Sequence, residues 1–141
     1  MKNAPIIKKE LIDSLKTPLY NAHSGYLPNY KGVSCGIWPL VNNEELVGVT
    51  IHEVVPEIDA GKIIYRKTIK LDKIPSNLFY GKYINDQQMN LIGNFICNYK
   101  NKENFQLSEK EGDGKYFSSP GITDYVRGLK NLKQLKKKGN E

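Results

Sequence analysis

The sequence has few of the residues that stabilise small secreted proteins or bind structural metals. It contains two cysteines, Cys35 and Cys97, and two histidines, which are too few for a disulfide framework. No Cys-x-x-Cys or His-x-x-x-His spacing supports a zinc site. We expect both thiols to be free and buried. Cys35 is also a candidate nucleophile near His23, although none of its sequence neighbours predicts a lowered thiol pKa.

Long apolar runs and two common catalytic motifs are also absent. No stretch approaches the roughly 20 apolar residues needed to span a bilayer, and the N-terminal residues lack the apolar segment of a signal peptide. We therefore expect a cytoplasmic protein with no membrane partner. The sequence has no phosphate loop of the Gly-x-x-x-x-Gly-Lys type. A Ser24–His23–Asp59 triad lacks the Gly-x-Ser-x-Gly elbow that exposes a nucleophilic serine.

The chain has the composition of a globular domain, with 39% hydrophobic and 26% charged residues. Its 141 residues are enough for one domain with a core of its own. The net charge of +6 is uneven, because residues 124–141 hold six Lys or Arg against two acidic residues. We interpret this tail as a surface helix docked through Val126, Leu129, Leu132 and Leu135. Contact with nucleic acid is the less favoured interpretation, because the sequence shows no separate module for it.

The hydrophobic pattern predicts strands and helices in alternation. Strands are expected at residues 19–22, 46–55 and 62–71, of which the last two form an antiparallel hairpin. Helices are expected within residues 5–15, 33–41, 76–99 and 124–138, with Ser76 as the N-cap of the third. Residues 24–32, 56–61 and 101–114 are expected to be loops, and residues 115–120 a short extended segment.

Three polar residues stand at the ends of predicted strands. Asn21 and His23 are two positions apart, so their side chains point to the same face of a strand. Asp59 lies in the loop of the predicted hairpin. An amide, an imidazole and a carboxylate that meet can supply a hydrogen-bond donor, an acid and a base. Each residue alone also has a structural explanation, as a turn former, a hydrogen-bonded histidine or a loop-closing aspartate.

The segments around these residues resemble the folate-dependent formyltransferases. This family includes the glycinamide ribonucleotide, methionyl-tRNA and sugar-amine formyltransferases. The resemblance covers about residues 5–71 and is carried by four segments in order: Asn21-x-His23; Leu27-Pro28 with Gly32; Gly48-Val-Thr-Ile-His52; and Asp59-Ala-Gly61 followed by Ile63-Ile64. One departure is Ser24-Gly25-Tyr26, which stands where many relatives carry Pro-Ser-Leu and leaves the shape of this loop open.

The resemblance implies formyl transfer from 10-formyltetrahydrofolate to the amine of a small substrate, such as an amino sugar or a nucleotide precursor. The positions that it assigns are catalytic for Asn21, His23 and Asp59, folate-binding for Val55, Glu57 and Ile58, and substrate-binding or supporting for Thr50, His52 and Gly32. Asn21 and a protonated His23 would stabilise the charged carbonyl oxygen, and Asp59 would take or relay a proton. The folate contacts run largely through backbone groups. His52 is equally well explained as a buried structural histidine, and no metal is implied.

The implied fold is α/β: part of a doubly wound, Rossmann-like formyltransferase domain that lacks its first strands and carries C-terminal helices. Residues 1–121 would form the C-terminal half of the catalytic domain and residues 122–141 a basic helix. In the family, the preceding segment supplies the first strands and much of the amine pocket. We therefore expect a complementing N-terminal half, a homodimer that covers the exposed strand edge, or a fragment of a longer protein. The alternative to an active half-enzyme is a truncated, non-catalytic binding protein.

Overall fold

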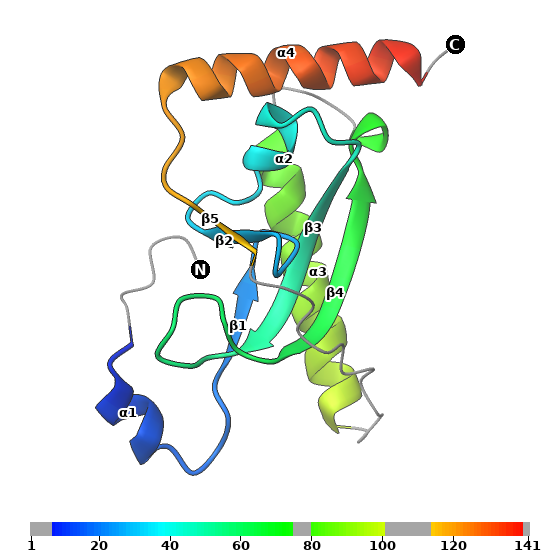
Figure 1. The fold of residues 1–141 in the computed structure, drawn as a ribbon. Helices are drawn as coiled ribbons and strands as arrows, with labels where there is room; N and C mark the ends of the chain where they lie inside the picture. Colours follow the sequence, from blue (N-terminus) through cyan, green and yellow to red (C-terminus); the bar gives the residue numbers. More distant parts are fainter. Residues whose placement is uncertain (1–6, 75–79, 101–113, 140–141) are drawn as a thin grey trace.

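A three-stranded antiparallel sheet lies at the centre of the computed structural model, which describes residues 7–74, 80–100 and 114–139 (Figure 1). Its strand order is β1 (Tyr20–His23), β3 (Leu46–Glu53) and β4 (Ile63–Lys70). β1 pairs with β3 so that Asn21 lies opposite His52 and His23 lies opposite Thr50. This register brings the polar residues of both strands to one end of the sheet.

The predicted β3–β4 hairpin is confirmed, but its pairing is irregular. Ile51 pairs with Tyr65 and His52 pairs with Ile63, so β4 has one extra residue, Ile64, at this point. A β-bulge of this kind interrupts the two-residue alternation of side chains. Ile63 and Ile64 are both buried, at 2% and 5% exposure, and only Ile64 belongs to the main core cluster.

A second, two-stranded sheet joins distant parts of the chain. β2 (Tyr30–Gly32) pairs in parallel with β5 (Lys115–Phe117). The extended segment after residue 114 is confirmed, whereas β2 lies inside a segment that we expected to be entirely loop. The Phe117 ring stacks on Tyr30 and packs against Trp38, with both centroid separations at 5.0 Å.

The helix α3 (Tyr80–Lys100) covers one face of the central sheet (Figure 1). Its buried residues Ile84, Leu91 and Phe95 join the main core with the apolar side chains of β3. The predicted N-cap of this helix, Ser76, lies outside the described residues. No described helix is both long and apolar enough to cross a membrane.

Two short helices are smaller or less buried than the sequence pattern predicts. α2 (Trp38–Val41) is a single turn that begins just before Pro39, which is tolerated in the first turn because no backbone N–H is needed there. α1 (Lys9–Ser14) buries none of its residues, and Leu11 is 54% exposed. The apolar spacing of α1 therefore does not correspond to packing within the described chain.

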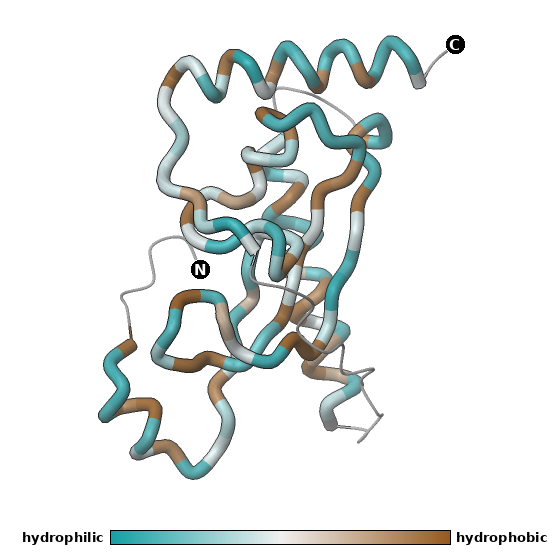
Figure 2. Tube along the Cα trace, viewed as in Figure 1, coloured by the Kyte–Doolittle hydropathy of each residue, from teal (hydrophilic) through white to brown (hydrophobic). Residues whose placement is uncertain are grey.

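The C-terminal helix α4 (Ile122–Lys138) packs on α2 and on the 3-10 turn η1 (Leu71–Lys73). Docking is confirmed for Leu132, which is fully buried, but not for Val126 and Leu129, which are 62% and 42% exposed. Each residue turns an α-helix by about 100°, so residues three positions apart are separated by about 300° rather than a full turn. Apolar residues at every third position therefore do not stay on one face of the helix. Hydrophilic and hydrophobic residues alternate along α4 (Figure 2), and four of its lysines are exposed: Lys130, Lys133, Lys137 and Lys138.

The packing of α4 predicts different effects for two leucines of this helix. Leu132→Ala should lower the free energy of unfolding by about 2–5 kcal/mol, because it leaves a cavity in the core. Leu129→Ala, the same change at an exposed position, should cost less than about 1 kcal/mol. Urea unfolding followed by circular dichroism measures both. Equal effects would contradict the orientation of α4.

Candidate functional site

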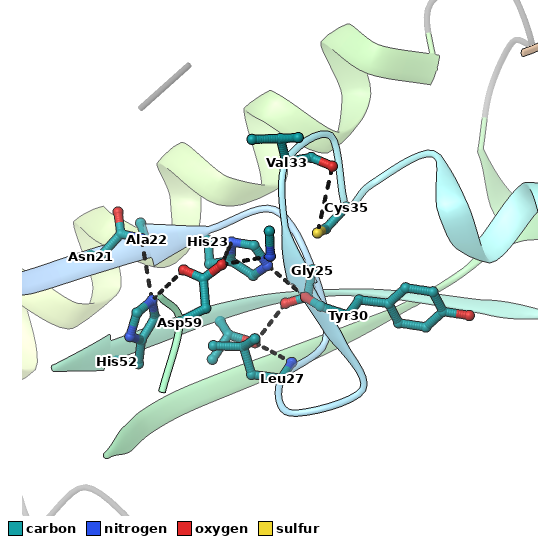
Figure 3. A network of polar contacts seen from close by, with 12 residues as sticks. Asn21, Ala22, His23, Gly25, Leu27, Tyr30, Val33, Cys35, His52 and Asp59 are labelled. Carbon is teal, nitrogen blue, oxygen red and sulfur yellow. Dashed lines mark hydrogen bonds and ion pairs between the residues drawn. The ribbon is translucent and has the colours of Figure 1, made fainter. Parts of the chain in front are cut away.

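The carboxylate of Asp59 lies between the two histidine rings (Figure 3). Its Oδ2 is 3.7 Å from Nδ1 of His23, and its Oδ1 is 3.4 Å from Nε2 of His52. The backbone N–H of Gly32 also donates to Oδ2, at 2.8 Å. All three side chains are at most 10% exposed. One carboxylate thus connects the ends of β1, β2 and β3.

The loop between β3 and β4 has the shape needed to deliver this carboxylate. Asp59 has a φ of 49°, in the left-handed region that aspartate adopts more readily than most residues. The loop closes through a bond of 2.9 Å from the N–H of Glu53 to the carbonyl of Lys62. Gly61 passes so close to Glu53 that a Cβ would lie 1.9 Å from its carbonyl oxygen. The Asp-x-Gly sequence therefore has a steric basis.

His23 is held by the backbone of the following loop. Its Nε2 lies 2.7 Å from the carbonyl oxygen of Tyr30. Because a carbonyl only accepts, the ring proton is on Nε2 and Nδ1 faces Asp59 when the imidazole is neutral. A Cβ on Gly25 would lie 2.6 Å from Nε2. Gly25 and Tyr30 are thus part of the site, although the sequence alone did not indicate a role for either residue.

Asn21 and His52 face each other across the β1–β3 pair. Nδ1 of His52 lies 2.8 Å from the carbonyl of Glu53, so this nitrogen donates. Nε2 of the neutral ring then accepts from Nδ2 of Asn21, at 3.2 Å. His52 therefore contacts two of the three predicted catalytic residues and orients both.

Thr50 fixes the turn that follows His23. Its side chain is fully buried, its hydroxyl donates to the carbonyl of Gly25 at 2.7 Å, and it accepts from the N–H of Leu27 at 3.2 Å. Arg66 holds the same turn from β4, because its Nη1 donates to the carbonyl of Leu27 at 2.9 Å. The predicted supporting position of Thr50 thus corresponds to a defined pair of hydrogen bonds.

The electrostatics of the site favour a neutral imidazole beside an ionised carboxyl. Burial lowers the pKa of His23 below its usual 6.5, although the charge of Asp59 opposes this shift. Burial alone would raise the pKa of Asp59, but the contact with His52, the proximity of His23 and the hydrogen bond from the N–H of Gly32 outweigh it and hold this pKa below 3.8. His23 is therefore uncharged near neutral pH, whereas the catalytic role drawn from the sequence used its protonated form.

The three residues expected to contact folate lie on the β3–β4 loop, which also carries Asp59. Val55 is half-buried, Glu57 is exposed, and Ile58 is 46% exposed. Within the described ranges, their backbone N–H and C=O groups have no hydrogen-bond partner. An exposed apolar side chain beside unpaired backbone groups fits a flat heterocycle that both stacks and hydrogen-bonds.

The thiols take no part in this chemistry. Cys35 is buried, and its Sγ lies 3.8 Å from the carbonyl of Val33. Burial, followed by the charge of Asp59, raises the pKa of Cys35 to about 12, which argues against a nucleophilic thiolate. Cys97 is exposed on α3, so the expectation of a second buried thiol is wrong. The described residues contain no group of three or more His, Cys, Asp or Glu arranged to hold a metal ion.

Comparisons of sequence and of structure with known proteins point to the same family. Residues 3–96 match the family model described as formyl transferase. The chain is 28% identical over 135 residues to the bifunctional polymyxin resistance protein ArnA of Wigglesworthia glossinidia brevipalpis. This match covers 92% of the chain and 20% of that protein.

Solved structures of similar fold include the formyltransferase PseJ from Anoxybacillus kamchatkensis, with a TM-score of 0.68 and 20% identity. That match covers 81% of this chain and 59% of PseJ. An N-formyltransferase from Helicobacter canadensis has a TM-score of 0.62 and 25% identity over 91% of this chain and 51% of its own. The predicted α/β fold, as part of a formyltransferase fold, is confirmed. The chain spans between half and three fifths of the length of these solved relatives.

The bonds of Thr50 predict a measurable cost of removing its hydroxyl. Thr50→Val keeps the shape of the side chain but leaves the N–H of Leu27 and the carbonyl of Gly25 unpaired. We expect a loss of about 1–3 kcal/mol in the free energy of unfolding, measured in urea. Thr50→Ser retains the hydroxyl and should cost less. A larger loss in the serine variant would show that packing, rather than hydrogen bonding, accounts for Thr50.

The lowered pKa of His23 predicts a loss of stability in mild acid. The unfolded imidazole titrates near 6.5 and the folded one lower, so the unfolded chain binds more protons as the pH falls below about 6.5. Stability should therefore fall more steeply between about pH 7 and about pH 5 than in His23→Gln, which has no titrating ring. Parallel slopes in urea titrations of the two proteins would contradict a buried neutral imidazole. The Asp59 contribution is lost at lower pH, below about 3.8.

Proposed function

Because this chain belongs to the formyl transferase family, we propose that it carries the catalytic site of a formyltransferase. The reaction is transfer of a formyl group from 10-formyltetrahydrofolate to an amine of a small substrate. The observation that carries this proposal is the meeting of Asn21, His23 and Asp59 in one buried network, within the region that matches the family model. An amide donor, an imidazole and an ionised carboxylate are the groups that acyl transfer to an amine requires.

Each side chain of the site has a different role in the reaction. The formyl folate, when bound, supplies an activated one-carbon acyl group. Nδ2 of Asn21 has a second N–H that can donate to the formyl oxygen as it gains negative charge, and His23 becomes a second donor by exchanging its Nε2–H bond to the carbonyl of Tyr30 for one to that oxygen. Asp59, ionised near neutral pH, accepts the proton that the attacking amine loses and returns it to the folate nitrogen as the bond from that nitrogen to the formyl carbon breaks. His52 holds Asn21 and Asp59 in position.

The loop of residues 54–62 supplies the surface for the folate. The unpaired backbone groups of Val55, Glu57 and Ile58 offer donors and acceptors for a pterin ring, and the side chain of Ile58 offers apolar contact. Recognition through the backbone constrains loop shape more than residue type. The left-handed Asp59 and the close approach of Gly61 set that shape.

An amino sugar attached to a nucleotide is the acceptor that we propose. PseJ is described in complex with UDP-4,6-dideoxy-4-formamido-L-AltNAc and tetrahydrofolate. The Helicobacter canadensis enzyme is described with folinic acid and dTDP-3-aminofucose. A nucleotide precursor that carries an amine is the other small acceptor to test. Because this chain spans only part of such relatives, we also propose that a complementing chain supplies the rest of the acceptor pocket.

A turnover assay tests the proposed chemistry. The chain would be incubated with 10-formyltetrahydrofolate and an amino-sugar nucleotide, alone and with a supplied complementing half. His23→Ala and Asn21→Ala should each lower the turnover rate by about 100-fold or more, because each removes a donor to the developing charge. Asn90→Ala, at an exposed position on α3, should leave turnover unchanged.

If neither turnover nor folate binding is seen, with the chain alone or with a complementing half, the proposed formyltransferase activity is wrong and the non-catalytic alternative is favoured. Turnover that survives His23→Ala would mean that the catalytic centre lies elsewhere in the chain.

A further inference from the structure

Arg66 of β4 contacts the loop that follows His23 in two places. It lies opposite Thr50 in the β3–β4 pair, so both side chains point to the same face of the sheet. Its Nη1 donates to the carbonyl of Leu27 at 2.9 Å. Its guanidinium carbon lies over the ring of Tyr26, 4.8 Å from the centroid, within the range of a cation–π contact. No ion pair joins Arg66 to a carboxylate in the described ranges, so its charge is directed to this loop.

Tyr26 and Leu27 are fixed to the sheet by Arg66 and by β3. A Cβ on Gly48 would lie 2.6 Å from Cδ2 of Tyr26, so the ring lies directly against the backbone of β3. Leu27 is 1% exposed, and its N–H donates to the hydroxyl of Thr50. The two loop residues therefore contact both strands of the hairpin, and Arg66 supplies the contact with β4.

Tyr26 in turn positions the carbonyl that binds His23. The N–H of Tyr30 donates to the carbonyl of Tyr26 at 3.1 Å. The carbonyl of Tyr30 lies 2.7 Å from Nε2 of His23 (Figure 3). The position of the group that binds the imidazole thus depends on Tyr26, which Arg66 holds in place.

Two oxygen atoms compete for the ring proton of a neutral His23. The carbonyl of Tyr30 lies 2.7 Å from Nε2, whereas the carboxylate of Asp59 lies 3.7 Å from Nδ1, beyond hydrogen-bond distance. An ionised carboxylate is nevertheless the stronger acceptor. The proton therefore stays on Nε2 only while the carbonyl of Tyr30 is held close. A small movement of the loop would favour the other tautomer, with Nδ1–H facing Asp59.

We propose that Arg66 is a positioning residue that selects the tautomer of His23. It holds the loop of residues 24–30 so that the carbonyl of Tyr30 stays against Nε2. Arg66 acts through this loop and not on the substrate. The consequence for turnover rests on the proposed function, in which Nε2–H of His23 becomes a donor to the formyl oxygen. The selection of the tautomer itself does not.

Nitrogen-15 NMR of the imidazole tests this role, because the protonated and the bare nitrogen of a neutral ring differ. The chain has two histidines, and His23→Gln identifies the signals of His23 by removing them. At about pH 8 this ring is neutral. Arg66→Met should lower the ratio of the Nε2–H to the Nδ1–H tautomer by about tenfold, the effect of about one hydrogen bond. Arg127→Met, the same change at an exposed position on α4, should leave the ratio unchanged.

Arg66→Lys separates the charge from the shape of the side chain and keeps the test decisive if Arg66→Met does not fold. Lysine retains the charge and a donor, but it has no planar group to cover Tyr26 while it bonds to Leu27. We therefore expect a smaller fall in the tautomer ratio. Tyr26→Leu, which removes the ring, should lower the ratio as well.

The same variants should slow formyl transfer in the turnover assay. Arg66→Met should reduce the turnover rate by about tenfold or more, because a proton donor that is out of place no longer meets the developing charge. Arg127→Met should leave the rate unchanged. Urea unfolding is the control for stability, because a purely structural role of Arg66 would lower the free energy of unfolding without changing the tautomer.

Three outcomes would overturn the proposal. These are an unchanged tautomer ratio in both Arg66→Met and Arg66→Lys, an equal change in Arg127→Met, or a His23 ring that carries its proton on Nδ1 in the unaltered chain. The tautomer is measured without substrate, so the two proposals fail separately. A tautomer that depends on Arg66 in a chain without formyl transfer would refute the proposed function alone. Turnover with a tautomer that is insensitive to Arg66 would refute the positioning role alone.

Discussion

The buried carboxylate of Asp59 is the group on which this end of the molecule depends. Burying a charged carboxylate costs several kcal/mol unless hydrogen bonds and neighbouring charges compensate it. The carboxylate contacts three separate segments, namely the end of β1, the backbone of β2 and the side chain of His52, and the N–H of Gly32 in β2 donates to it. Each segment is short, and none would hold its position alone. The network that would perform catalysis is therefore also the network that keeps these segments together.

The charge state of this network suits the chemistry proposed for it. An ionised Asp59 beside a neutral His23 gives the site one negative charge and several neutral donors. Negative charge on the formyl oxygen develops only during the reaction, so donors that are already aligned stabilise the transition state more than the ground state. The contact of Asn21 with His52 provides that alignment for the amide, and the contact of His23 with Tyr30 fixes the orientation of the imidazole ring.

The sequence predicted those parts of the structure whose cause is local. The spacing of Asn21 and His23 placed both on one face of β1, and the β-branched residues of β3 and β4 predicted their hairpin. β2 could not be predicted in this way, because Tyr30 pairs with Lys115, far along the chain. The contact of His52 with both Asn21 and Asp59 depends on strand register and on the ring tautomer, which residue spacing does not specify. The folate-binding positions Val55, Glu57 and Ile58 stay predictions.

The bulge in the β3–β4 hairpin has a consequence for how this site can change over time. The extra residue Ile64 sets how the backbone leaves β3 at His52 and where the following loop carries Asp59. Losing or gaining one residue would turn successive side chains to the other face, whereas exchanging Glu57 or Ile58 for another type would not. We therefore expect substitutions at Glu57 and Ile58 to be tolerated, whereas insertions or deletions in this loop, like changes at Asp59 or Gly61, would disrupt the site.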